Sequence, residues 1–160
     1  LVRAARGDLQ LTKIKIENQD WTLYTSGVRT YALIDVYQCA LYLNGKTEFP
    51  EFIEGLNYPV AIRVKILTSE LPDQVPNPWK ETIRPEVSEQ MFKRFKKQFV
   101  KLDEGDDLTF VYTPEGTTCV YLNKKKVFSD PGPGLMQALL EQWIGDDPIS
   151  GGLKEELVGE

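Results

Sequence analysis

Arg29 and Tyr37 are the two residues of this 160-residue chain whose types and surroundings best suit chemistry. Both lie in the stretch 28–43, which is rich in aromatic and aliphatic residues and carries one other charge, Asp35. A partly buried arginine needs a partner, because an unpaired charge is costly to remove from water. The sequence leaves two alternatives open: a structural Arg29–Asp35 pair beside a core tyrosine, or an anionic ligand held by the guanidinium fork and the phenol.

Residue types alone exclude several kinds of catalytic and metal site. The chain has no histidine, which rules out Ser-His-Asp and Cys-His catalysis and histidine general bases. Its two cysteines, Cys39 and Cys119, are too few for a structural zinc site of the usual Cys/His kind. The acidic group around Gly105 lacks the spacing of a calcium loop. We therefore expect neither a metal nor a cofactor.

The two cysteines are expected to be free thiols. By simple alternation Cys39 shares a strand face with Tyr37 and Leu41, whereas Cys119 lies on a different strand. Nothing in their spacing requires them to approach within disulfide distance. Without a histidine or another basic neighbour to activate it, neither thiol is expected to be catalytic.

Charge and hydropathy narrow the classes of partner. Lys and Arg number 19 against 24 Asp and Glu, and this net charge of −5 argues against a nucleic-acid binder. The longest uncharged runs, Val36–Gly45 and Pro131–Leu140, are too short for a membrane span, which needs about 20 residues. We expect residues 1–8 to form a disordered tail and residues 9–160 to form one domain.

The elements that must position these residues follow from hydrophobic periodicity. The expected strands are 11–16, 21–24, 28–43, 58–68, 107–113 and 117–122. Turns are expected at Ser26–Gly27, Asn44–Gly45 and Lys124–Lys126. The expected helices are a short one from Asn77, then 88–102, 134–144 and 150–158. Strands and helices are grouped rather than alternating, which predicts an α+β fold with an antiparallel sheet covered by helices.

Several segments resemble the signatures of the chalcone isomerase-like proteins. They are Ser26-Gly27-Val28-Arg29, Val36-Tyr37 with Leu41-Tyr42-Leu43, the hairpin Thr113–Thr118 with Leu122-Asn123, and Trp143-Ile144-Gly145 followed by Pro148 and Leu153–Leu157. They occur in the family's order across most of residues 11–159, and the short length resembles the bacterial branch. The resemblance implies an open-faced β-sandwich with a ligand cleft between a large antiparallel sheet and helices. By analogy with bacterial relatives it also implies export.

The same resemblance separates two activities within the family. Arg29 matches the arginine of the plant isomerases, but Tyr37 stands where they carry a threonine. A tyrosine at this place resembles the plastid fatty-acid-binding branch, in which Arg and Tyr hold the lipid carboxylate. Residues 59–111 contain no tyrosine to match the catalytic one, and the hydroxyl position of the late helix carries Met136.

Three functional hypotheses follow. The first is a non-catalytic protein that binds a small amphipathic carboxylate, with Arg29 and Tyr37 on the head group. The candidate residues for its tail are Leu33, Trp79, Leu139 and Trp143. The alternative is an isomerase or intramolecular lyase of the chalcone isomerase type, with Arg29 stabilising charge and Tyr37 acting as an acid. The third is a structural or partner-binding domain whose cleft is sealed by side chains.

Overall fold

The computed structural model describes residues 12–45, 56, 58–69, 84–86, 88–99 and 102–158. Within these ranges the chain forms a seven-stranded antiparallel sheet in which each strand pairs with the next one in sequence. The strands are β1 (Lys13–Ile16), β2 (Gln19–Tyr31), β3 (Ile34–Leu43), β4 (Val60–Ile66), β5 (Asp107–Tyr112), β6 (Thr117–Leu122) and β7 (Lys125–Pro131). The helices are α2 (Glu89–Phe99), α3 (Gly134–Ile144) and α4 (Gly151–Val158), with a short 3₁₀ turn η2 at Arg84–Glu86.

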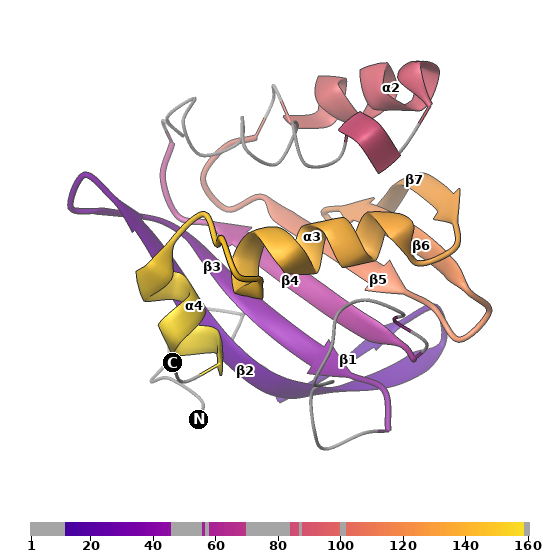
Figure 1. The fold of residues 1–160 in the computed structure, drawn as a ribbon, viewed down its shortest axis with the longest axis horizontal. Coiled ribbons are helices and arrows are strands. Elements are labelled where there is room, and N and C mark those ends of the chain that lie inside the picture. The colour runs from indigo at the N-terminus through magenta and orange to yellow at the C-terminus, as the bar shows by residue number, and fades with distance from the viewer. Residues whose placement is uncertain are drawn as a thin grey trace.

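The helices lie on one face of this sheet. Figure 1 shows α3 crossing the middle strands, α4 against β2, and α2 near the β7 side. The expected α+β fold, an antiparallel sheet packed by helices, is thus confirmed. None of the described helices is long and apolar enough to cross a membrane.

Alternation along the strands explains the main core. In β4, Val60, Ile62, Val64 and Ile66 point toward the helices and join the large hydrophobic cluster, as expected from the sequence. This cluster also takes in buried side chains of β3, β5 and α3, and we call its side of the sheet the helix-covered face.

The opposite face carries a smaller core of its own. Trp21, Tyr42 and Val111 are buried there, and Ile14 and Ile16 of β1 pack against them. The sheet curls so far that the β1–β2 turn reaches the strands at the other end of the sheet. Glu17 of this turn pairs with Lys126 of β7. We call this second side the curled face.

Three expectations about the strands were wrong. No turn occurs at Ser26–Gly27, since β2 continues to Tyr31. Residues 28–43 do not form one strand, because the chain reverses at Ala32–Leu33, where both residues have positive φ, and β3 begins at Ile34. A Cβ on Gly27 would lie 2.9 Å from Glu156 Cβ, so this glycine serves the close approach of α4 rather than a turn. Strand β7 begins at Lys125, where the sequence predicts a turn at Lys124–Lys126 instead.

Other expectations were met or lie outside the described residues. Helices α2, α3 and α4 fall within the expected ranges, and Gly145 ends α3 by donating its N–H to the Glu141 carbonyl.

Both cysteines are buried and free, Cys39 on the helix-covered face and Cys119 on the curled face. Burial raises the pKa of Cys39, so this thiol stays protonated and unreactive at neutral pH. The expected tail at 1–8 and the helix from Asn77 lie outside the described residues.

Candidate functional site

Arg29 and Tyr37 face each other across strands β2 and β3, because the pairing register places them directly opposite. Opposed residues of an antiparallel pair project from the same side of the sheet, with Cβ atoms about 4.5–5.5 Å apart. Tyr37 belongs to the large core, so both side chains lie on the helix-covered face. The structure therefore brings together the two residues that the sequence singled out.

Tyr37 is held by a residue of α3. Its hydroxyl accepts a hydrogen bond from Trp143 Nε1 at 2.8 Å, and the two rings meet edge to face with centroids 6.5 Å apart. Trp143 also lies against Phe110, with centroids 6.2 Å apart. An indole N–H can only donate, so the phenol accepts this bond and its own hydrogen points elsewhere.

Arg29 is only partly satisfied by its surroundings. Its Nη1 donates to the Thr30 carbonyl at 3.1 Å, and its guanidinium carbon lies 5.8 Å from the centre of the Tyr31 ring. Its Nε is buried and has no hydrogen-bond partner among the described residues. Asp35 accepts a hydrogen bond from Thr30 Oγ1 at 3.0 Å, and no ion pair joins it to Arg29. The structural Arg29–Asp35 pair therefore does not form between these two described residues.

Helix α4 closes this end of the helix-covered face. Glu156 Oε2 accepts a hydrogen bond from the backbone N–H of Val28 at 3.0 Å, and the Glu156 carbonyl accepts one from Thr25 Oγ1 at 3.3 Å. These bonds fix α4 beside the strand that carries Arg29. Sequence reasoning missed Glu156, although the glycine two residues before Arg29 was a signal that another element approaches closely.

The structure brings together only some of the residues predicted to contact the apolar tail of a ligand. Leu139 and Trp143 lie on α3 and are fully buried against the sheet. Leu33 occupies the turn after β2 and exposes 98% of its surface, so it does not lie with them. Trp79 is outside the described residues.

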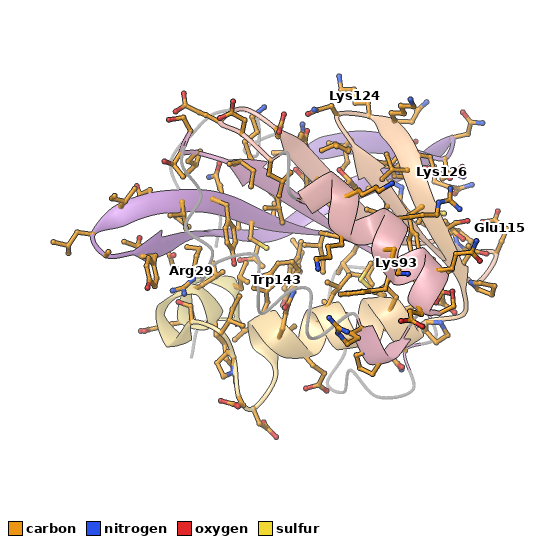
Figure 2. All side chains as sticks on the ribbon, turned by 90° about the horizontal axis from the view of Figure 1, so that it is seen from above. Arg29, Lys93, Glu115, Lys124, Lys126 and Trp143 are labelled. Carbon is orange, nitrogen blue, oxygen red and sulfur yellow. The ribbon has the colours of Figure 1, made fainter. Side chains whose placement is uncertain are left out.

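Tyr37 and the apolar residues of α3 are tightly packed. Tyr37, Leu139 and Trp143 expose at most 1% of their surface, because they contact one another and the strands beneath. Figure 2 shows Arg29 and Trp143 on the side of the sheet where α3 and α4 lie. An apolar ligand can therefore reach Tyr37 only if side chains of α3 move aside.

The described part of the chain contains no group of three or more Cys, Asp or Glu side chains placed to hold a metal ion.

The charged pair that sequence reasoning overlooked is Arg63–Asp107 on the curled face. Arg63 Nε donates to the Asp107 carboxylate at 2.9 and 3.1 Å, and both residues are buried.

The comparisons with known proteins agree with this architecture. The family model of the chalcone isomerase-like proteins matches residues 7–159. Among solved structures, the Arabidopsis thaliana fatty-acid-binding protein AtFAP1 is similar, with a TM-score of 0.64 and 18% sequence identity. The match covers 89% of this chain and 88% of that one, and at this identity it shows a shared fold. No match was found among curated proteins. The family match covers nearly the whole chain and the fold agrees with it, so the chain belongs to the chalcone isomerase-like family.

Proposed function

We propose that this protein binds a small amphipathic carboxylate, such as a fatty acid, between the sheet and helices α3 and α4, without catalysing a reaction. The observation that carries the proposal is the buried Nε of Arg29, which has no hydrogen-bond partner within the described ranges; Arg29 itself lies directly opposite Tyr37 in register. The similarity to a fatty-acid-binding protein supports the same class of ligand.

The head group belongs at Arg29. Arginine presents parallel N–H donors in a planar fork, and a carboxylate accepts two of them at once. A buried donor left unpaired costs about 1–3 kcal/mol, so a ligand that satisfies Nε recovers that cost. Tyr37 lies beside it as a second polar contact.

The tail belongs along α3, with Leu139 and Trp143 as its contacts. Trp143 is the side chain that must yield, because it covers Tyr37 in the present packing. Each methylene that leaves water on binding adds about 0.8 kcal/mol, so longer chains bind more tightly than shorter ones. Leu33 has no part in this site, because it stands at the tip of the β2–β3 hairpin.

Calorimetry with octanoate, decanoate and dodecanoate tests the proposal on protein first stripped of lipid. Arg29→Ala should weaken binding of every chain by at least about tenfold, as expected for loss of a charge-assisted bond. Arg94→Ala is the matched control, because Arg94 lies on the exposed side of α2. Equal affinities for wild type and Arg29→Ala would refute the assignment.

The same preparations decide the isomerase alternative. That activity requires cyclisation of a chalcone faster than its spontaneous rate, and faster in wild type than in Arg29→Ala. Met136, at the position where the isomerases carry a hydroxyl, is fully buried and offers no proton. We therefore expect only the spontaneous rate, and a faster one would replace the binding proposal.

A further inference from the structure

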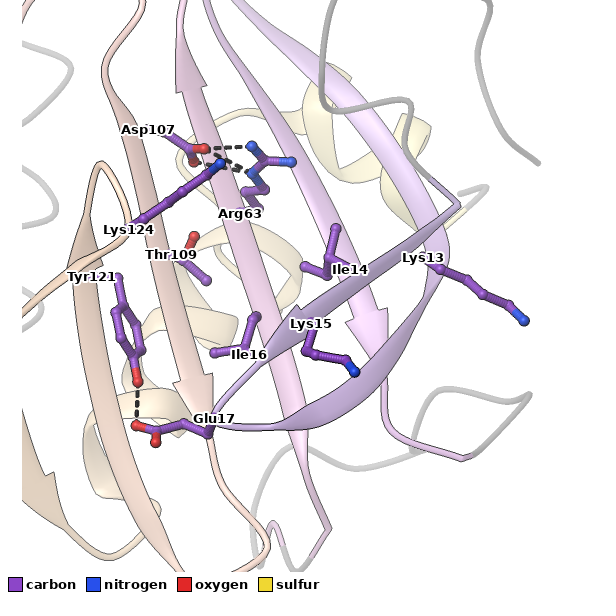
Figure 3. Close-up of a pocket in the computed structure, with 10 residues that line it drawn as sticks. All are labelled: Lys13, Ile14, Lys15, Ile16, Glu17, Arg63, Asp107, Thr109, Tyr121 and Lys124. Atoms are coloured by element: carbon purple, nitrogen blue, oxygen red, sulfur yellow. Dashed lines mark hydrogen bonds and ion pairs between the residues drawn. The ribbon is translucent and has the colours of Figure 1, made fainter.

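A cavity opens on the curled face, on the other side of the sheet from Arg29 and Tyr37. It has a volume of about 460 Å³ and lies between β1 and the strands β4, β5 and β6 (Figure 3). Small-molecule sites commonly measure about 300–1,000 Å³ and combine apolar walls with a few polar groups. Ile14, Ile16 and the Tyr121 ring supply apolar surface here, while Arg63, Thr109 and Lys124 supply polar groups.

The walls of this cavity are held in place across the curled sheet. Glu17, in the turn after β1, accepts a hydrogen bond from the Tyr121 hydroxyl and pairs with Lys126 Nζ at 2.7 Å. These contacts join the first hairpin to β6 and β7. The cavity is therefore formed before any ligand arrives, which lowers the cost of ordering on binding.

The charges around the cavity favour an anion. Asp107 is neutralised by the fork of Arg63, and Glu17 is neutralised by Lys126. Lys15 of the wall pairs with Asp20 at 3.9 Å, so the exposed Lys124 is the basic wall residue placed to meet an anion. Figure 3 shows Lys124 extending toward the Arg63–Asp107 end, whereas Lys13 points away.

We propose that this cavity is a second binding site, which takes a small organic anion with an apolar body. Its anionic group lies at Lys124 and Thr109, and its body lies against Ile14, Ile16 and the Tyr121 ring. The site does not depend on the carboxylate site at Arg29, because the two occupy opposite faces of the sheet.

Fluorescence titration with anilinonaphthalene sulfonate, an anion with an apolar ring system, tests this proposal. Lys124→Glu should weaken probe binding by about tenfold, because it reverses a charge next to the bound anion. Lys125→Glu is the matched control: Lys125 is the next residue, is exposed, and is not part of the wall. Lys125→Glu and Arg29→Ala should each change the affinity by less than about twofold.

Competition with decyl sulfate and with inorganic phosphate tests the chemistry of the ligand. Decyl sulfate should displace the probe at much lower concentration than phosphate, because only decyl sulfate covers the apolar wall. The proposal is overturned if no saturable binding appears, if Lys124→Glu and Lys125→Glu act alike, or if only Arg29→Ala weakens binding. It is also overturned if phosphate competes as well as decyl sulfate.

Discussion

At the scale of single residues, the hydrogen bond between Trp143 and Tyr37 joins α3 to β3 across 106 positions of sequence. Replacing Trp143 by Phe removes the donor, and replacing Tyr37 by Phe removes the acceptor. Each change should lower the free energy of unfolding by about 1–3 kcal/mol, because it leaves a buried polar atom without this partner. Chemical denaturation of both single variants and the double variant measures the coupling. Losses that simply add would show that the bond contributes nothing of its own.

At Gln38, by contrast, a substitution should raise the free energy of unfolding. Its side chain is fully buried on the curled face, and neither amide atom has a hydrogen-bond partner in the part of the chain that the structure describes. Gln38→Leu should therefore raise the free energy of unfolding by about 1 kcal/mol, because it removes buried polar atoms that pay desolvation without compensation. Gln90→Leu on the exposed side of α2 is the control and should stay within about 0.5 kcal/mol. A loss of stability in Gln38→Leu would mean that the amide has a partner when the protein is in solution.

The sequence was enough to single out Arg29 and Tyr37, but not to predict what surrounds them. Arg29 and Tyr37 could be singled out because a charge and a phenol are conspicuous in an apolar stretch. The bond to Trp143 could not be predicted, since it depends on where α3 crosses the sheet. The Arg63–Asp107 pair was missed for a similar reason: it depends on the register between β4 and β5, which local periodicity does not give.

At the scale of elements, Gly27 sets the distance between β2 and α4. A Cβ at this position would lie 2.9 Å from Glu156 Cβ, closer than real Cβ atoms approach, and 3.0 Å from Leu153 Cδ1, which is tighter than most real contacts. Gly27→Ala should lower the free energy of unfolding by about 1–3 kcal/mol, because α4 must shift outward. Faster hydrogen exchange of the α4 amides should accompany the loss.

Gly152→Ala is the control for that prediction. Gly152 lies within α4, and the nearest atom to a Cβ there would be Ser150 Oγ at 3.9 Å. Alanine fits this space and favours the helix by up to about 1 kcal/mol, so the variant should be at least as stable as wild type. Equal destabilisation by both substitutions would contradict the role assigned to Gly27.

The elements differed in how well the sequence predicted them. Strand β4 and helix α3 have regular apolar periods, and both were predicted close to their observed bounds. Strand β7 was not predicted, because it begins with Lys125 and Lys126 and ends with Pro131. Lysine and proline are the residues that protect an edge strand from further pairing, so they indicate a turn when read locally. In the folded protein this segment is a strand because it pairs with β6.

At the scale of the whole molecule, the curled sheet separates two environments. The helix-covered face is a packed core in which the side chains of α3 lie against the strands. The curled face has a smaller core beside an open cavity.

Cys39 and Cys119 lie on different faces and cannot form a disulfide without crossing the sheet. Thiol titration in denaturant without reductant should therefore find both groups reactive.

The contact that keeps the sheet curled should make stability depend on pH. Hydrogen bonds from Lys126 and then Tyr121 lower the pKa of Glu17 below its usual value of 4.5, and burial opposes them. A group whose pKa is lower in the folded state adds stability above its unfolded pKa and loses it as the pH falls through the folded value. Glu17 and Lys126 are partly exposed, so solvent screening should keep this contribution below about 1 kcal/mol.

The measurement is the free energy of unfolding of wild type and Glu17→Gln across the acid range. Wild type should be more stable at neutral pH, and its advantage should vanish as the pH falls through the lowered pKa of Glu17. Added salt should shrink the advantage as well, since the pair is accessible to solvent. Glu155→Gln, on the exposed side of α4, should show no such convergence. If wild type kept its full advantage in acid, the carboxylate charge would not be what ties the first hairpin to β6 and β7.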